Sequence, residues 1–256
     1  MIGVFVFQSA LREFMRPKRF LPWVFLGLGT LAMALLWKRF SPETENSVIY
    51  GNLSEMLVFR LLGLVSAIYT TAIISQEVEQ KTIIYLLTRP VPRWQLLVAR
   101  YLASVIVVSL ITFIAAIFAS YGVYRNQFLS NPYLWSDLKA FILGAFAYGA
   151  LFLVVSLLIN RAMIVCLLYA FGWETAVPNM PGESYYTSIF SYLQTLSQHP
   201  RGENNPLLGF LSGQLSTNQM SSSMPWLVLP MMTILLLALG CLWFTHFEYV
   251  PREDAE

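Results

Sequence analysis

The chain has 256 residues, of which 57% are hydrophobic and only 12% are charged, and its mean hydropathy is +0.60. A soluble domain usually carries about 25% charged residues, so a single aqueous core cannot bury this much apolar surface. The excess indicates helices in contact with lipid. The net charge of only +2 gives no indication of a nucleic-acid partner.

The first predicted element is an amphipathic helix within residues 1–19. Between residues 4 and 16, apolar side chains recur at helical spacing. They are Val4, Phe7, Leu11 and Phe14. The segment is too short to cross a membrane and is basic, so we expect it to lie in the membrane interface with its cationic side towards lipid headgroups. The basic residues are Arg12, Arg16, Lys18 and Arg19. Because they follow the apolar stretch, a cleaved signal peptide is not expected.

Six apolar runs follow, and most reach the roughly 20 residues that a helix needs to cross about 30 Å of hydrocarbon. They cover about residues 20–37, 56–75, 101–122, 138–159, 162–178 and 225–244. The fifth run is the shortest and is expected to break near Gly172 or Pro178. Tryptophans lie near the ends of the runs, as interfacial anchors do. The prediction is an all-α integral membrane protein, with one domain of six transmembrane helices over residues 1–256.

Two connections are longer than simple turns, and the second of them covers residues 179–224. Within it, aromatic and aliphatic residues recur at helical spacing and predict a short amphipathic helix that lies at the outer surface or dips into it. These residues are Tyr185, Ile189, Tyr192, Leu193 and Leu196. The chain shows no internal repeat, so an inverted-repeat secondary transporter finds no support.

Basic residues predict which side of the membrane each loop faces, because cytoplasmic loops are enriched in lysine and arginine. With a cytoplasmic N-terminus, that side collects Arg12, Arg16, Lys18, Arg19, Lys81, Arg89, Arg93, Arg100, Arg161 and Arg252. The other side keeps Lys38, Arg39, Arg125, Lys139 and Arg201. This two-to-one excess predicts that both termini are cytoplasmic.

Common catalytic and nucleotide-binding motifs are missing from the sequence. No glycine is followed by lysine, so there is no phosphate-binding loop of the GxxxxGK[ST] type. Neither His199 nor His246 lies in an apolar run and no HExxH occurs, which disfavours an intramembrane protease. Buried acidic residues are expected to be missing from the runs, which disfavours a proton-relay carrier. Cys166 and Cys241 are expected to be small hydrophobes rather than a disulfide or metal pair.

Two charged residues are candidates for a translocation path or an outer gate. Arg60 lies about one turn into the second run, where it would face a polar cavity or an anionic group of a substrate. Two other interpretations are that it reaches the outer interface or that it pairs with Glu55 or Glu174. Glu174 is the second candidate, although a purely structural role is favoured for it.

The connection between the second and third runs carries the most specific pattern. Glu77 and Glu79 follow the second run directly, and Pro90 and Pro92 later force the chain to reverse. The apolar residues between them form a helical turn. The pattern indicates a short, rigid amphipathic helix just below the membrane, suited to receiving force from a docked cytosolic partner. A simple interfacial hairpin is the alternative.

This segment resembles the loop between the second and third helices of ABC-2 type permeases. In that family an acidic-x-acidic pair precedes a Thr and a Leu-Leu-x-x-Pro-hydrophobic-x-Arg pattern. The matching positions are Glu77, Glu79, Thr82, Leu86, Leu87, Pro90, Val91 and Arg93. The family often has Gly before the Thr and Lys near the start of the third helix, where this chain has Lys81 and Arg100. The layout of a basic first helix, six spans and a long segment before the last span is also similar.

The resemblance implies a permease that forms a homodimer and pairs with two copies of a separate ABC ATPase. Residues 76–99 would be the cytoplasmic coupling region, and residues 1–19 would provide a second contact. The residues expected to couple to the ATPase are Glu77, Glu79, Lys81, Thr82, Leu86, Leu87, Arg89, Pro90 and Arg93. Residues 179–224 would fold back as external or re-entrant helices. No cofactor or metal is expected on this chain, because ATP and Mg would bind the ATPase.

The expected function is therefore the membrane subunit of an ATP-driven exporter in the plasma (inner) membrane, not an enzyme in its own right. The alternative is a non-transporting membrane partner of an ABC ATPase that relays a mechanical or signalling state.

Overall fold

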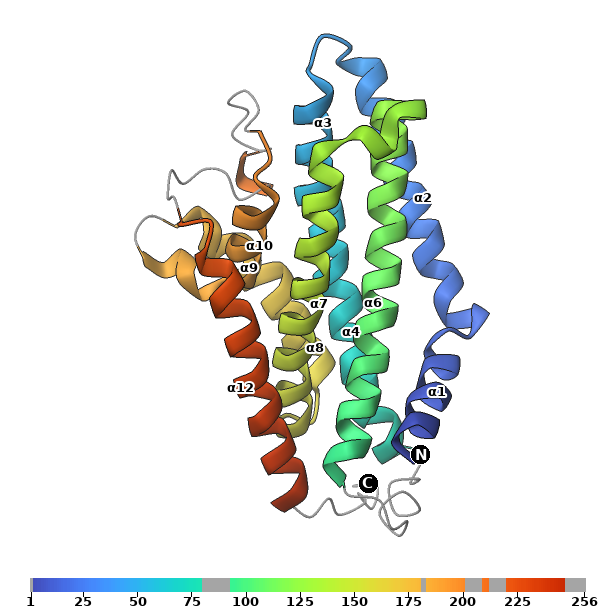
Figure 1. Cartoon of the computed structure of the whole chain (residues 1–256), viewed down its shortest axis with the longest axis vertical. Helices are drawn as coiled ribbons and strands as arrows, with labels where there is room; N and C mark the ends of the chain where they lie inside the picture. Colours follow the sequence, from blue (N-terminus) through green and yellow to red (C-terminus); the bar gives the residue numbers. More distant parts are fainter. Residues whose placement is uncertain (1, 80–92, 181–182, 201–208, 212–219, 247–256) are drawn as a thin grey trace.

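The computed structural model describes residues 2–79, 93–180, 183–200, 209–211 and 220–246 (Figure 1). Over these residues the chain is α-helical and has no strand, as the sequence predicts. Its long helices lie side by side along the long axis of the molecule (Figure 1). Five of them are long and apolar enough to cross a membrane. They are Pro17–Phe40, Asn46–Ile73, Trp94–Ser130, Pro132–Leu158 and Met224–His246.

Different helices begin and end at the two ends of this bundle. At one end α1 (Ile2–Phe14) and the start of α2 (Pro17–Phe40) lie beside the end of α4 (Phe59–Glu79) and the start of α6 (Arg93–Tyr124) (Figure 1). We call this the proximal end. The opposite end, where α2 ends and α7 (Pro132–Leu158) begins, is the distal end. The last described helix, α12 (Met224–His246), finishes at the proximal end (Figure 1).

A proline sets the boundary between α1 and α2. Proline disfavours a helical conformation of the residue before it, and Arg16 is extended, with φ −55° and ψ 133°. Pro17 then occupies the first turn of α2, where its missing N–H costs nothing. The apolar stripe of α1 turns towards the bundle, because Phe14 is buried and Phe7 and Leu11 pack against the core.

The second span begins ten residues before the apolar run that predicts it. It is built from α3 (Asn46–Leu53), a π-helical turn (Ser54–Val58) and α4, which follow one another without a break. The added residues include Ser47, Asn52 and Glu55, which lower the local hydropathy even though all three are buried. Hydropathy alone therefore placed the start of this span too late.

The central element of the bundle is α6, which packs against α1, α2, α4 and α7. Its approach to α2 is close, since a Cβ at Gly122 would lie 2.5 Å from the Cβ of Ala34. The Nζ of Lys38 also donates to the carbonyl of Val123 across 2.6 Å. A 3-10 turn (Arg125–Ser130) then leads to α7. The side chain of Asn131 caps the start of α7 by accepting from the N–H of Tyr133.

The predicted fifth run is helical but is not a regular span. It consists of α8 (Ala162–Leu168), a π-helical turn (Tyr169–Trp173), α9 (Glu174–Ala176) and a 3-10 turn (Val177–Asn179). Gly172 lies in the π turn and Pro178 in the 3-10 turn, which are the two places where the sequence predicts a break. Over the described residues, the count of six regular spans is therefore not confirmed.

A short helix, α10 (Ile189–Ser197), lies between this run and α12, preceded by a 3-10 turn (Glu183–Thr187). The apolar stripe that predicts it does face the interior: Ile189, Tyr192 and Leu193 are buried. Ser188 caps its first turn by accepting from the N–H of Ser191. At its other end Gln198 adopts a left-handed conformation, with φ 50°, which turns the chain sharply towards the bundle.

The outermost helices, α2 and α12, bury little of their surface. On α2 only Gly27, Thr30 and Ala34 are buried. On α12 the buried residues are Pro225, Leu229, Thr233 and Gly240. The remaining surface of both helices is predominantly apolar, and such a surface is stable only where lipid or another protein covers it.

Candidate functional site

Of the nine predicted coupling residues, the structure describes the backbone of three, and these three lie at the proximal end. Glu77 and Glu79 are in the last turn of α4, and Arg93 is the first residue of α6. The remaining six lie outside the described residues. They are Lys81, Thr82, Leu86, Leu87, Arg89 and Pro90. Because α4 ends and α6 begins at the same end of the bundle (Figure 1), the connection between them joins two helices there.

The turn between α1 and α2 is fastened to α4 by Tyr69. The ring of Phe14 packs edge-on against the ring of Tyr69, with centroids 5.5 Å apart. The hydroxyl of Tyr69 lies 3.5 Å from the carbonyl oxygen of Phe14 and 3.4 Å from that of Arg19. Tyr69 is about two turns from Glu77, so the N-terminal helix is anchored beside the end of α4 that leads into the coupling region.

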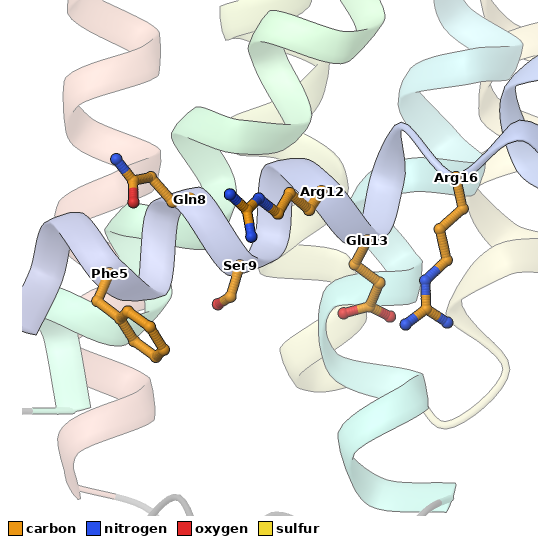
Figure 2. A pocket seen from close by; sticks show the side chains of 6 residues that line it. All are labelled: Phe5, Gln8, Ser9, Arg12, Glu13 and Arg16. Carbon is orange, nitrogen blue, oxygen red and sulfur yellow. The ribbon is translucent and has the colours of Figure 1, made fainter.

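Basic side chains of the N-terminal segment point away from the bundle. Arg12, Arg16 and Lys18 are exposed, and Arg19 forms an ion pair with Glu13 at 3.4 Å. A shallow hollow of about 560 Å³ runs along one flank of α1 (Figure 2). It is lined by Phe5, Gln8, Ser9, Arg12, Glu13 and Arg16. The charged groups in this lining are the guanidinium groups of Arg12 and Arg16 and the carboxylate of Glu13.

A second site, which the sequence did not predict, lies at the distal end. Two carboxylates from different helices meet one imidazole: Glu55 from the π-helical turn before α4, Asp137 from α7, and His199 from just after α10. The side chains of Asp137 and His199 are 0% exposed, and that of Glu55 is 1% exposed. Buried charges at this depth are tolerated only when they are paired. We call these three residues the distal cluster.

Both ring nitrogens of His199 face a carboxylate. Its Nδ1 lies 3.2 Å from Oε1 of Glu55, within hydrogen-bond geometry. Its Nε2 lies 2.9 Å from Oδ1 of Asp137, which is an ion-pair distance, although the two groups are not aligned for a hydrogen bond. Only a doubly protonated ring presents an N–H to both sides.

The remaining oxygens of the two carboxylates also have partners. Oδ2 of Asp137 accepts from the hydroxyl of Tyr50 at 2.8 Å and from that of Ser54 at 2.7 Å. Oε2 of Glu55 accepts from the side-chain amide of Gln194 on α10, at 3.2 Å. These bonds fix the orientation of each carboxylate towards His199.

The surroundings favour a charged His199. Burial by itself lowers the pKa of His199, but the neighbouring Asp137 and Glu55 outweigh it and raise that pKa to about 10. The histidine is therefore an imidazolium at neutral pH, and it lies between the side chains of Glu55 and Asp137. Since both ring nitrogens carry protons, the ring has no lone pair to offer a metal ion.

Three aromatic rings surround the imidazolium. Tyr50 and Tyr133 each have their centroid 5.9 Å from that of His199, and Phe59 lies at 6.3 Å, all at steep angles. A small residue is needed on the remaining side, because a Cβ at Gly51 would lie 3.0 Å from the Cβ of His199. The hydroxyl of Ser54 points to Asp137 rather than to the histidine, so the cluster does not activate a nucleophile.

The expectation that buried acidic residues are missing from the spans is wrong. Glu55, Asp137 and Glu174 are each at most 1% exposed. Glu55 and Asp137 stand immediately before the second and fourth apolar runs, so a hydropathy window assigns them to loops. A signal did exist, because each is followed directly by an uninterrupted helical pattern, and a helix extended by one turn would include it.

Glu174 binds the start of α10. Its carboxylate accepts from the hydroxyl of Ser188 at 2.6 Å and from the backbone N–H groups of Ile189 and Phe190 at 3.1 and 2.9 Å. These N–H groups belong to the first turn of α10, where backbone N–H groups have no hydrogen-bond acceptor within their own helix. A carboxylate there also interacts favourably with the helix dipole. A role for Glu174 in the translocation path stays a prediction.

Arg60 also contacts the segment between α9 and α12. Its guanidinium lies 4.4 Å from the ring centroid of Phe190, and its Nη2 donates to the carbonyl of Leu211 at 3.2 Å. Glu174 and Glu55 add favourable electrostatic interactions. Whether Arg60 lines a pathway also stays a prediction.

The comparisons with known proteins agree with the arrangement of helices. Residues 11–173 match the sequence profile of a family described as ABC-2 family transporter protein. Among curated proteins, none matches the chain. The matched region begins in α1, covers four of the five long helices and ends directly before Glu174. The chain thus belongs to the ABC-2 family, and it is a multi-pass membrane permease component of an ABC transporter.

Proposed function

We propose that this chain is the permease subunit of an exporter, driven through residues 76–99 by a separate ABC ATPase. Two copies of the chain would form the membrane unit and would pair with two ATPase subunits that bind ATP and Mg. Both termini would face the cytoplasm, so the proximal end would be the cytoplasmic side of the plasma membrane. The chain would itself perform no chemistry, since the motor would be another polypeptide.

The continuity of the two helices that flank the coupling region supports this proposal best. From Asn46 to Glu79 the chain is helical without interruption, over about 50 Å, and α6 is about 48 Å long. Both therefore extend from the proximal end to the distal end. A displacement of the coupling region would act on two stiff rods, and their far ends would move with it.

The irregular run from Ala162 to Asn179 fits a sixth crossing. The end of α7, where this run starts, is proximal, whereas Gln194 of α10 contacts Glu55 and His199, just after α10, contacts Asp137 at the distal end. The chain must therefore return from one end to the other between these points. We propose that this run and α10 form the outer part of the exit pathway, with α10 lying on the external side.

The decisive experiment is to purify the tagged chain from its native membranes in mild detergent and to measure Mg-dependent ATP hydrolysis in the eluate. An ATPase is expected to co-purify with the unaltered chain. The double variant Glu77→Lys, Glu79→Lys is expected to lose at least tenfold of that activity, because it reverses both charges beside the coupling region.

The chain offers a matched control for this variant. Glu43 and Glu45 have the same spacing, are exposed, and lie at the distal end. The double variant Glu43→Lys, Glu45→Lys should retain the associated ATPase. The proposal fails if no ATPase accompanies the unaltered chain, or if both double variants retain it equally. Stimulation of ATP turnover by a transported compound would further separate an exporter from a membrane relay that moves nothing.

A further inference from the structure

We infer that the distal cluster is a latch: His199 holds α10 onto the distal end of the bundle, and separation of His199 from Glu55 and Asp137 accompanies opening of the exit. The holding role stands on the contacts alone. The opening step rests on the proposed function, because it requires a cycle of conformations driven by an ATPase.

The helix α10 is contacted near both of its ends and in its middle. Glu174 binds the N–H groups at the start of this helix, and His199 lies two residues after its last residue. Between them, Leu193 sits against α7 at Gly144, where an added Cβ would be only 2.8 Å from the leucine Cδ1. The helix is therefore held by hydrogen bonds to Glu174 at its start, by the ion pairs of His199 just after its end, and by close packing in the middle.

The three charged groups of the distal cluster are stable in the protein interior only while all of them stay paired. Burying three charged groups costs much of the energy that their pairing returns, so the intact cluster adds little net stability. Removing one partner, however, leaves an uncompensated buried charge and is strongly unfavourable. Partly separated arrangements of the cluster are therefore unfavourable, and the protein has two discrete arrangements, with the cluster either closed or fully separated. Conformational switches use elements that have two discrete packings.

The distal cluster is connected to the proximal end through α4. Glu55 belongs to the π-helical turn that continues directly into α4, whose last turn carries Glu77 and Glu79. Such turns occur mostly as single insertions in α-helices, frequently at functional sites. A shift or rotation of α4 would move Glu55 relative to His199, because His199 is on a separate segment. The latch would thus respond to the same rod that leads to the coupling region.

The holding role is tested by hydrogen exchange of the full chain in lipid nanodiscs, without any ATPase. His199→Ala should speed exchange of the amides of α10 by about 100-fold or more, as expected for breaking a buried charge pair. The control is His246→Ala, which removes the exposed histidine at the end of α12 and should leave α10 unchanged.

Chemical rescue separates the ionic role from simple loss of packing. Added imidazole should slow the exchange of α10 in His199→Ala, because an imidazolium can donate to both carboxylates. Added 1-methylimidazole has one N–H donor when protonated and should rescue far less. Equal rescue by both, no rescue by either, or unaltered exchange in His199→Ala would each overturn the holding role.

The opening step is tested on the unaltered chain with its co-purified ATPase. Trapping that complex with Mg-ATP and vanadate should speed exchange of the α10 amides at least tenfold relative to the nucleotide-free complex. Unchanged exchange in the trapped complex would refute the opening step. If no ATPase co-purifies, the proposed function fails, and the nanodisc experiment still decides whether His199 holds α10.

Discussion

Replacing His199 by glutamine should reduce the stability of the distal end by an amount that falls as the pH rises. Glutamine keeps a donor but carries no charge, so the two carboxylates lose their counter-ion. A pKa of about 10, against the ordinary value of 6.5, means that the folded state holds the imidazolium proton more tightly than the unfolded chain. Linkage then makes the protonated ring stabilise the folded state, relative to a neutral ring, by roughly 5 kcal/mol below pH 6.5, at about 1.36 kcal/mol per pKa unit.

The sign of the pH dependence follows from the same shift. Because the folded pKa is raised, the stabilisation is complete below pH 6.5, decreases to roughly 3 kcal/mol at pH 7.5, and is lost as the pH passes about 10. At neutral pH this agrees with the 3–5 kcal/mol typical of breaking a buried ion pair. The difference between the unaltered chain and His199→Gln should therefore shrink steadily from pH 6.5 to pH 10.

The assay is thermal unfolding in lipid nanodiscs, followed by tryptophan fluorescence and by exchange of the α10 amides, at half-unit steps across this pH range. His246→Gln is the control, and it should track the unaltered protein at every pH. A difference that is independent of pH, or that grows as the pH rises, would refute the assignment of His199 as the counter-ion of the two carboxylates.

Three further substitutions test the packing around this site and between the spans. Gly122→Ala should lower the thermal midpoint by forcing α2 away from α6, at a cost of about 1–3 kcal/mol, whereas Gly29→Ala, which has no neighbour within 4 Å, should not. Glu174→Gln should weaken the start of α10 by about 0.3–2 kcal/mol, measured as faster exchange of its first amides. Ser54→Ala removes one hydrogen bond to Asp137 and should cost about 1–3 kcal/mol in the same unfolding assay.

The sequence was sufficient to predict the membrane class and the helical stripes of α1 and α10. Both rest on periodicity, which depends on side chains that lie next to one another on the same helix. The stripe of Phe7, Leu11 and Phe14 does pack against the bundle, and that of Ile189 and Leu193 does face the interior. Spacing along one helix reports which side is apolar, whatever covers that side.

The distal cluster escaped prediction for a physical reason. Its members are separated by more than 60 residues along the chain, and each alone is a polar residue at the edge of an apolar run. A hydropathy scale assigns Glu55 and Asp137 a high free-energy cost of burial and so places them outside the membrane. Their pairing with His199 removes most of that cost. The pairing depends on how α7 and α10 come together, which no local pattern encodes.

The sequence also could not reveal the irregular turns that place the acidic residues. One π-helical turn contains Glu55, and the other ends directly before Glu174. Such a turn inserts an extra residue into the helix and rotates everything beyond it by about 100°. Residues that a regular helix would direct towards one neighbour are then directed towards another. Projections that assume 3.6 residues per turn fail across these two points.

The use of charges rather than apolar contacts to hold α10 has a physical basis in the membrane. If α10 separated from α7 at the outer membrane surface, lipid tails there could cover Leu193 nearly as well as α7 does, because they are as apolar as leucine, so packing alone would select the bundle weakly. A carboxylate and an imidazolium gain nothing from lipid, which offers them no partner. The polar contacts of Glu174, Glu55 and Asp137 therefore contribute more than Leu193 to selecting the position of α10. In the proposed exporter, cargo that leaves beside α10 would pass an element whose position depends on one protonated histidine.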